Sequence, residues 1–231
     1  MRKIGIILTI CIIASMTGCG KRNNFDLEKL EFPIAKDSIK FNLDKGLDNF
    51  SMIIYDTKDK EAMYFDNLSL SGTLNKGDLP FLPLENKLSF YEDKKSGMID
   101  AYQIEIVTTN KTLKLEKLLE KNFGKADFDY KNDNFRFRIW ESENKAYFFE
   151  VKYTGQYNGK SYTASYLYVV NKNNEMLYRW IMSGGFQYYA DYLDEKNKDE
   201  HKNQPYSYKD FVIQQEKEYG AENYYVKDYV K

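Results

Sequence analysis

Residues 145–166 constrain the fold of this 231-residue chain more than any other segment. Two runs that alternate between apolar and polar residues flank the pair Asn158-Gly159. An Asn-Gly pair between such runs is typical of a tight β-hairpin turn, because the turn needs positive φ angles that these residues tolerate. The turn sets the register, and the expected cross-strand pairs are Tyr157 with Lys160, Gly155 with Tyr162, Tyr153 with Ala164, and Val151 with Tyr166.

The two faces of this hairpin differ in composition. Side chains two positions apart share a face, so the paired tyrosines lie together. The opposite face is expected to be solvated, and it carries Lys152, Thr154, Gln156, Ser161, Thr163 and Ser165.

Other segments have the composition of strands. They are short, rich in β-branched and aromatic residues, and bounded by Gly, Asn, Asp or Lys. These segments are residues 51–56, 87–93, 98–108, 134–140 and the run MLYRWIM at 176–182. Together with the hairpin they predict an antiparallel sheet.

Two segments have helical periodicity instead. Leu115, Leu118, Leu119 and Phe123 fall on one helical face, and Gly124 follows where a C-cap glycine belongs, which predicts a helix over about 112–123.

Near the end of the chain, Ser207 and Asp210 have capping-box spacing. The residues after this cap recur with helical spacing, which predicts a C-terminal helix over about 208–219. One face of this helix carries Tyr208, Phe211, Val212, Gln215 and Tyr219. The expected fold is a single α+β domain, mainly an antiparallel β-sheet with one central helix and this C-terminal helix.

Motifs for catalysis or metal binding are weak. His201 is the single histidine, so the sequence has no second histidine for a multi-histidine zinc site and only one candidate base for a Ser-His-Asp triad. The run DEKNKDEHKNQ from Asp194 predicts a solvated polar loop around His201. The neighbouring carboxylates lack EF-hand spacing and are interpreted as a solvated charge run, comprising Asp191, Asp194, Glu195, Asp199 and Glu200.

The remaining patterns also point away from a recognisable reaction. The segment MSGGF at 182–186 is interpreted as a turn, since it lacks the Lys-Ser/Thr of a phosphate-binding loop. No pair of carboxylates stands out as a glycosidase pair. The sequence therefore predicts no catalytic residue, no cofactor and no metal site.

The N-terminus has the layout of a secretory signal peptide. Arg2 and Lys3 precede an apolar run of about 11 residues, and small residues follow it. A membrane-spanning helix needs roughly 20 apolar residues, so this run is expected to be cleaved off rather than to remain as an anchor.

The segment Met16-Thr17-Gly18-Cys19 resembles the lipobox of bacterial lipoproteins, with Met16 where an aliphatic residue is usual. The resemblance covers only residues 1–19, and it implies cleavage before Cys19 and lipidation of that cysteine. The expected organisation is a signal peptide at 1–18, a lipidated cysteine with a polar tether at 19–31, and the globular domain at 32–231. Cys11 would leave with the signal, so no disulfide is expected.

The resemblance also implies a location. A multiply acylated cysteine exceeds the two-chain threshold for stable anchoring, so the chain would be held on a membrane of the cell envelope without spanning it. Gly20 follows the cysteine, where an aspartate would retain a lipoprotein in the inner membrane, so the outer membrane is favoured if the cell has two.

Charge narrows the partners. The chain has 34 Lys and Arg against 35 Asp and Glu, interleaved, without the basic stripe of a nucleic-acid-binding protein.

Two function classes remain. The first is a noncatalytic envelope protein that binds a protein or a cell-wall glycan, with an immunity protein against a toxin as a specific form. The second is an envelope hydrolase that uses unidentified carboxylates.

The hairpin tip is the expected contact surface. Tyr157 and Tyr162 are expected to be partly exposed beside Gly155, where a ring can lie across the glycine, and to bind the partner. The alternative is that the whole tyrosine face of the hairpin belongs to the core. Tyr153 and Tyr166 are expected to hold the base of the hairpin in the core.

Overall fold

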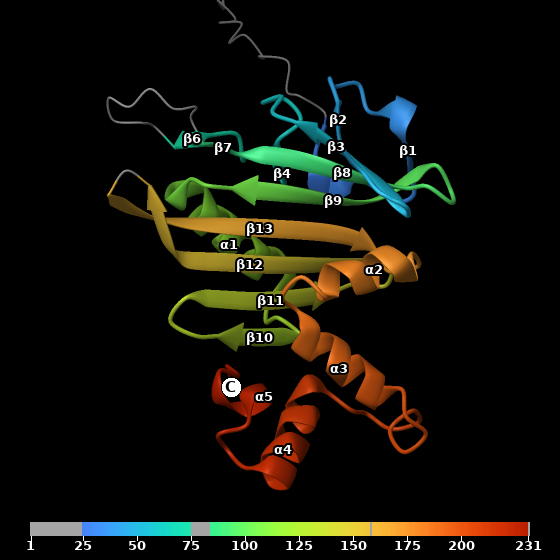
Figure 1. Cartoon of the computed structure of the whole chain (residues 1–231), viewed down its shortest axis with the longest axis vertical. Helices are drawn as coiled ribbons and strands as arrows, with labels where there is room; N and C mark the ends of the chain where they lie inside the picture. Colours follow the sequence, from blue (N-terminus) through green and yellow to red (C-terminus); the bar gives the residue numbers. More distant parts are fainter. Residues whose placement is uncertain (1–24, 75–83, 158, 231) are drawn as a thin grey trace, which may run out of the picture.

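The computed structural model describes residues 25–74, 84–157 and 159–230, which form an α+β fold around a nine-stranded sheet (Figure 1). The strand order is β10-β11-β12-β13-β9-β8-β3-β2, with β1 beside β9, and every neighbouring pair is antiparallel. The strands are β1 (Ile34–Ala35), β2 (Asp44–Asp48), β3 (Met52–Thr57), β8 (Lys87–Asp93), β9 (Met98–Ile106), β10 (Phe128–Lys131), β11 (Phe135–Glu141), β12 (Lys145–Tyr157) and β13 (Lys160–Asn171). Two small two-stranded sheets flank it, formed by β4 (Tyr64–Phe65) with β5 (Leu68–Ser69) and by β6 (Thr73–Leu74) with β7 (Leu84–Glu85). The helices are α1 (Thr109–Phe123), α2 (Glu175–Met182), α3 (Gln187–Lys196), α4 (Tyr208–Tyr219) and α5 (Tyr224–Lys227), with short 3-10 turns at Leu27–Lys29 and Lys36–Ser38.

The predicted hairpin is formed by β12 and β13, and its register is as expected only near the turn. The pairs Tyr157–Lys160 and Gly155–Tyr162 are confirmed. A β-bulge between Lys152 and Gly155 then adds one residue to β12, so the two pairs predicted further from the turn are wrong. The observed pairs there are Lys152 with Ala164, Val151 with Ser165 and Glu150 with Tyr166.

The bulge changes which side chains share a face. Because the register shifts by one residue, Val151 pairs with Ser165, and the side chain of Tyr166 lies on the other face of the sheet from that of Val151. Ser165, expected on a solvated face, is fully buried, and its hydroxyl lies 3.0 Å from that of Thr112 on α1. Tyr153 packs against the core on the α1 side, so it and Tyr166 do not hold one base together.

Helix α1 covers one face of the sheet and lies behind it in Figure 1. Leu115 and Leu119 are fully buried in this core, and Leu118 and Phe123 pack at its margin. Gly124 caps the helix with a φ of 73°, a conformation that glycine adopts without a Cβ penalty. The central helix is thus confirmed, beginning three residues before its expected start.

The segment before β1 belongs to this core. Leu27 is 1% exposed, and its carbonyl accepts a hydrogen bond from the Tyr102 hydroxyl at 2.8 Å. The expected polar tether at 19–31 is therefore wrong from residue 25 onward, while its earlier part lies outside the described residues.

The run MLYRWIM forms α2 rather than the expected strand. Asn174 caps this helix by accepting a hydrogen bond from the Leu177 amide, and the buried residues Leu177, Tyr178, Ile181 and Met182 recur with helical spacing. A short apolar run fits a buried strand or a buried helix equally well, so the cap and the tertiary contacts decide. The turn predicted at 182–186 is confirmed between α2 and α3.

Helix α2 lies over one end of the second sheet face, α3 continues from it past β10, and α4 lies beyond that edge strand (Figure 1). Their side chains enclose an aromatic core around Phe128 and Phe148. The expected polar loop from Asp194 is wrong for its first residues, because α3 continues to Lys196. Helix α4 has the predicted bounds and capping box, although Tyr219 on its expected buried face is 68% exposed.

The C-terminal segment lies along the outer edge of the sheet. The Lys131 amide of β10 donates to the Asp228 carbonyl at 2.8 Å, and the Val230 amide donates to the Asp129 carbonyl at 3.0 Å. These bonds cover an edge that would otherwise expose unpaired backbone groups. Among the described residues, each helix is too short or too polar to cross a lipid bilayer.

Candidate functional site

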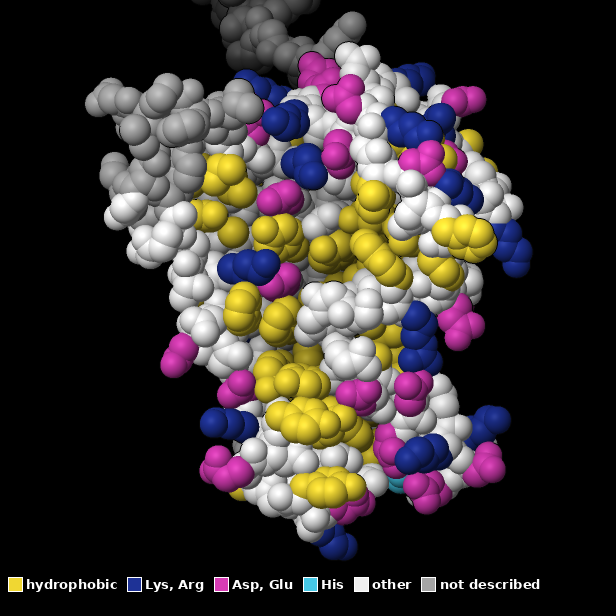
Figure 2. Space-filling model, in the orientation of Figure 1, with side chains coloured by type: hydrophobic (Ala, Val, Ile, Leu, Met, Phe, Trp, Pro, Cys, Tyr) yellow, Lys and Arg dark blue, Asp and Glu magenta, His cyan; other side chains and the backbone are white. Residues whose placement is uncertain are grey.

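The helices leave part of the second sheet face uncovered, and aromatic side chains cross it. Figure 2 shows this face, with apolar side chains gathered over the middle strands and Lys, Asp and Glu among them. Five rings of this region are referred to below as the aromatic band: Tyr162, Tyr166 and Tyr168 on β13, Tyr91 on β8, and Trp180 on α2. The three β13 tyrosines are half-buried and separated by four and two residues, both even numbers, so they point to the same side of the sheet.

Hydrogen bonds and ring contacts join the band across the strands. The Tyr91 hydroxyl donates to Gln103 Oε1 at 2.7 Å, and Gln103 Nε2 donates to the Tyr168 hydroxyl at 2.9 Å. The Tyr91 and Trp180 rings lie 5.6 Å apart, and Trp180 is 40% exposed. Tyr91 is itself only 3% exposed and supports the band from below, while Trp180 and the half-buried tyrosines of β13 meet solvent.

Charged side chains surround Tyr166. Backbone pairing places it directly between Glu105 on β9 and Glu150 on β12. Its hydroxyl donates to Glu105 Oε1 at 3.4 Å, and Lys152 Nζ lies 4.6 Å from the centre of its ring. Lys152 also pairs with Glu150 at 3.4 Å, so acidic, basic and aromatic groups alternate within a few ångströms.

Burial perturbs the titration of this region. Desolvation raises the pKa of Glu150, against the opposing attraction of Lys152. Burial, followed by the nearby charges of Glu150 and Glu105, also raises the pKa of Tyr168 to about 12. Tyr168 therefore stays a neutral hydrogen-bonding group at physiological pH.

A groove of about 900 Å³ lies beside the start of α2, with Phe50 and Met176 among its lining residues. Phe50 is 100% exposed at the β2–β3 turn, and Met176 is 37% exposed one helical turn before Trp180. The buried Asp100 carboxylate also lines the groove and accepts from Asn171 Nδ2 at 2.7 Å and Asn174 Nδ2 at 2.9 Å. Each oxygen of Asp100 thus has a hydrogen-bond partner, and the groove offers a partner both exposed apolar side chains and charged ones such as Lys95 and Glu175.

The hairpin tip has the ring-on-glycine contact expected from the sequence. A Cβ on Gly155 would lie 2.8 and 2.9 Å from two atoms of the Tyr162 ring and 2.7 Å from the Tyr162 carbonyl oxygen. Tyr162 is half-buried, and the side chain of Tyr157 lies outside the described part of the structure. The lipobox residues Met16, Thr17, Gly18 and Cys19 also lie outside it.

Several residues in the band or in contact with it had no functional assignment from sequence. Gln103 and Glu105 alternate with the buried Tyr102 and Ile104, and this period of two is the signal that could have placed them on an open face. The exposed position of Trp180 was missed because its segment was assigned to a strand and not to a helix. Tyr166 was assigned to the core because the bulge leaves no mark in the sequence.

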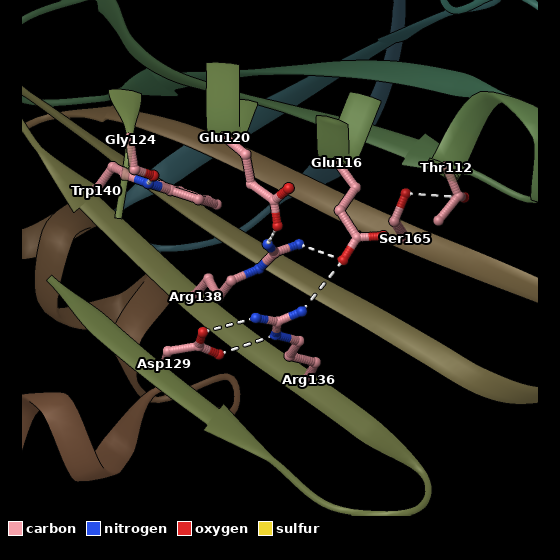
Figure 3. Close-up of polar contacts among 9 residues, drawn as sticks. All are labelled: Thr112, Glu116, Glu120, Gly124, Asp129, Arg136, Arg138, Trp140 and Ser165. Carbon is pink, nitrogen blue, oxygen red and sulfur yellow. Dashed lines mark hydrogen bonds and ion pairs between the residues drawn. The ribbon is translucent and has the colours of Figure 1, made fainter. Parts of the chain in front are cut away.

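The opposite face carries a cluster of paired charges between α1 and the sheet (Figure 3). Arg138 donates to Glu116 Oε1 at 2.7 Å and to Glu120 Oε1 at 2.6 Å. Arg136 makes two hydrogen bonds to Asp129, at 2.9 and 2.7 Å, and lies 3.5 Å from Glu116. Since the carboxylates are engaged by the arginines, this cluster is a clamp for α1 rather than a ligand site.

The acidic candidates of the α3 region come together only in part, because Glu195 and Glu200 lie beside His201 whereas Asp191 and Asp194 have other partners. Asp191 accepts from Gln187 and Tyr225, and Asp194 pairs with Arg179 at 2.8 Å. His201 is not solvated as expected: its side chain is 19% exposed and stacks on Tyr206 at 4.0 Å.

The chain matches no protein-family model, no curated protein and no solved structure. Function is therefore argued from the site itself, which offers a broad aromatic surface with mixed charges and, at one end, a groove with apolar and charged lining residues. Such a surface is suited to contact with a macromolecule.

Proposed function

We propose that this chain is a noncatalytic binding protein of the bacterial cell envelope, anchored by a lipid on Cys19, that binds a protein through the aromatic band. The observation that carries the proposal is the solvent-facing part of the band, formed by Trp180 and the half-buried β13 tyrosines and supported from below by the buried Tyr91. Tyr and Trp are the residues most enriched at the energetic centres of protein interfaces.

A protein partner is favoured over a glycan by the apolar groups that continue the band. Trp180, Met176 and Phe50 are all at least 37% exposed, and they give contact area without sugar-binding hydrogen bonds. Exposed apolar groups rimmed by charge are typical of protein contact sites. Neutralisation of a toxin by an immunity-type protein is the specific form that needs only such a surface.

The anchor is supported by the lipobox resemblance at Met16-Thr17-Gly18-Cys19 and the preceding apolar run. A Cys19→Ser variant is expected to lose labelling by a fatty-acid analogue and to accumulate as an unprocessed or soluble form. Unchanged labelling would contradict the anchor without bearing on the binding surface. Fractionation of a two-membrane cell would then test the outer-membrane location.

The binding surface is tested by site-directed crosslinking in intact cells. A photoreactive amino acid at position 166 or 180 is expected to capture one discrete protein, while the same group at the exposed Lys114 of α1 is expected to capture none. With the photoreactive group moved to position 168, the double variant Tyr166→Ala, Trp180→Ala should reduce capture at least tenfold. Tyr219→Ala on α4 is the matched control and should leave capture from position 168 unchanged. Equal capture from positions 114 and 166 would contradict the assignment, and capture of peptidoglycan would replace the protein by a glycan.

A hydrolase remains the second candidate because of one specific arrangement. Glu105 on β9 and Glu150 on β12 flank Tyr166 of β13 on one face. Their strands are two inter-strand spacings apart, so their backbones are separated by about 10 Å. Burial raises the pKa of Glu150, as a general acid requires. Release of peptidoglycan fragments that is lost in both Glu105→Gln and Glu150→Gln would establish this reading, and no release by the wild-type chain would exclude it for that substrate.

A further inference from the structure

We propose that Glu195, Glu200 and His201 bind one divalent transition-metal ion of the zinc type. These residues, the glutamate-histidine cluster, lie at the end of α3 and in the turn that follows it. Each offers one ligand atom, and the three atoms lie within 4.8 Å of one another. The proposal is independent of the aromatic band.

The spacing of the ligand atoms fits a small cation. His201 Nε2 lies 3.6 Å from Glu195 Oε1 and 3.6 Å from Glu200 Oε1. Zinc binds nitrogen and oxygen ligands at about 2.0–2.2 Å, so two ligands in a tetrahedral site lie about 3.3 Å apart. Small side-chain rotations therefore bring the three atoms to coordination distance.

The imidazole nitrogen is held in position without a hydrogen bond. Within the described residues, His201 Nε2 is buried and has no hydrogen-bond partner. The ring stacks on Tyr206 at 4.0 Å with an interplanar angle of 18°, which fixes its plane. A buried polar atom without a partner calls for a ligand or an ion, and here two carboxylates lie around it.

Neighbouring groups position the first carboxylate. Gln214 on α4 approaches Glu195 Oε1 with its Nε2 at 3.5 Å, and its Oε1 accepts from the Tyr206 hydroxyl at 2.5 Å. Lys198 binds the other oxygen of Glu195 at 2.5 Å and leaves Oε1 for the metal. Outer contacts of this kind orient metal ligands and raise affinity.

The donor set selects the class of metal. Calcium and magnesium prefer all-oxygen sites, whereas an imidazole together with carboxylates suits zinc and neighbouring transition metals. Glu195 and Glu200 carry two negative charges against one ammonium, that of Lys198, so a divalent cation is electrostatically favoured. Three protein ligands leave a fourth position for water.

The test uses the full chain in a Cys11→Ser, Cys19→Ser background, because these substitutions remove both thiols that could bind zinc. After chelation and dialysis, calorimetric titration with zinc chloride is expected to give one site per chain, with a rise in thermal midpoint in excess zinc. X-ray absorption of the zinc complex is expected to show one imidazole among light-atom ligands.

Variants separate this site from adventitious binding. His201→Gln and Glu200→Gln should each weaken zinc binding at least tenfold, while Glu216→Gln, an exposed glutamate on α4, should leave it unchanged. No binding at millimolar zinc, or equal binding by wild type and His201→Gln, would overturn the proposal and leave His201 as a partner for carboxylates alone.

Discussion

Arg138 Nη2 donates to Glu116 Oε1 at 2.7 Å, and this contact joins the middle of β11 to α1 at a side chain only 2% exposed. The guanidinium is also packed between the rings of Trp140 and Phe149, at 5.2 and 5.3 Å from their centres. An arginine so enclosed depends on its carboxylates, because its own desolvation is costly.

Removal of this arginine is expected to destabilise the fold strongly. Arg138→Ala leaves Glu116 and Glu120 without their shared partner and should lower the free energy of unfolding by about 3–5 kcal/mol. Arg138→Lys keeps the charge but loses the fork that reaches both carboxylates, so an intermediate loss is expected. Denaturant unfolding measures both, with the exposed pair Arg179–Asp194 as control, where Arg179→Ala should cost about 0–1 kcal/mol. Equal losses for Arg138→Ala and Arg179→Ala would contradict the clamp.

The two leucines on opposite sides of α1 provide a matched test of the helix face. Leu119 is fully buried, whereas Leu113 is 46% exposed on the same helix. Leu119→Ala should cost about 2–5 kcal/mol through lost burial and a residual cavity. Leu113→Ala should cost less than about 1 kcal/mol, since exposed sites tolerate truncation. Thermal or denaturant unfolding decides, and a similar loss at both positions would show that the face is assigned wrongly.

Gly155 is expected to be required for the hairpin tip because of space. A Cβ there would meet both the ring and the carbonyl oxygen of Tyr162. Gly155→Ala should therefore lower the free energy of unfolding by about 1–3 kcal/mol. In a Tyr162→Ala background the loss should shrink without vanishing, since the carbonyl contact at 2.7 Å remains. A double-mutant cycle measures this coupling, and strict additivity would mean that the ring does not rest on the glycine.

Glu150 is expected to make stability depend on pH. Desolvation raises its pKa in the folded protein above the ordinary value of 4.5. Between these two pKa values the folded state holds a proton that the unfolded state has released, so the free energy of unfolding falls as pH rises through that window.

Glu150→Gln removes this titration and keeps the shape of the side chain. The variant should be more stable than wild type at pH 7. This difference should become smaller toward pH 4, where Glu150 of the wild type is mostly protonated in both the folded and the unfolded state. Unfolding at both pH values tests this, with the exposed Glu143→Gln as control. A loss of stability at pH 7 would mean that attraction to Lys152, 3.4 Å away, outweighs desolvation.

Local signals in the sequence were enough for several elements. The leucine spacing with Gly124 determined α1, and the Ser207–Asp210 capping box determined α4 within its observed bounds. The Asn158-Gly159 pair determined the hairpin turn and its first two cross-strand pairs. In each case the residues that decide the structure are a few positions apart, so composition and spacing carry the information.

Long-range packing decided the rest. Segment 176–182 is a helix because its apolar side chains meet the aromatic core on the second sheet face, which a strand-like composition does not exclude. The bulge at Lys152–Gly155 added one residue to β12 and moved Tyr166 from an expected core position to the open face. Likewise, His201 is enclosed only because Tyr206 and the end of α3 come together after folding. Side-chain identity is local, but which face is covered depends on elements far apart in the chain, so the candidate surfaces became visible only in the tertiary structure.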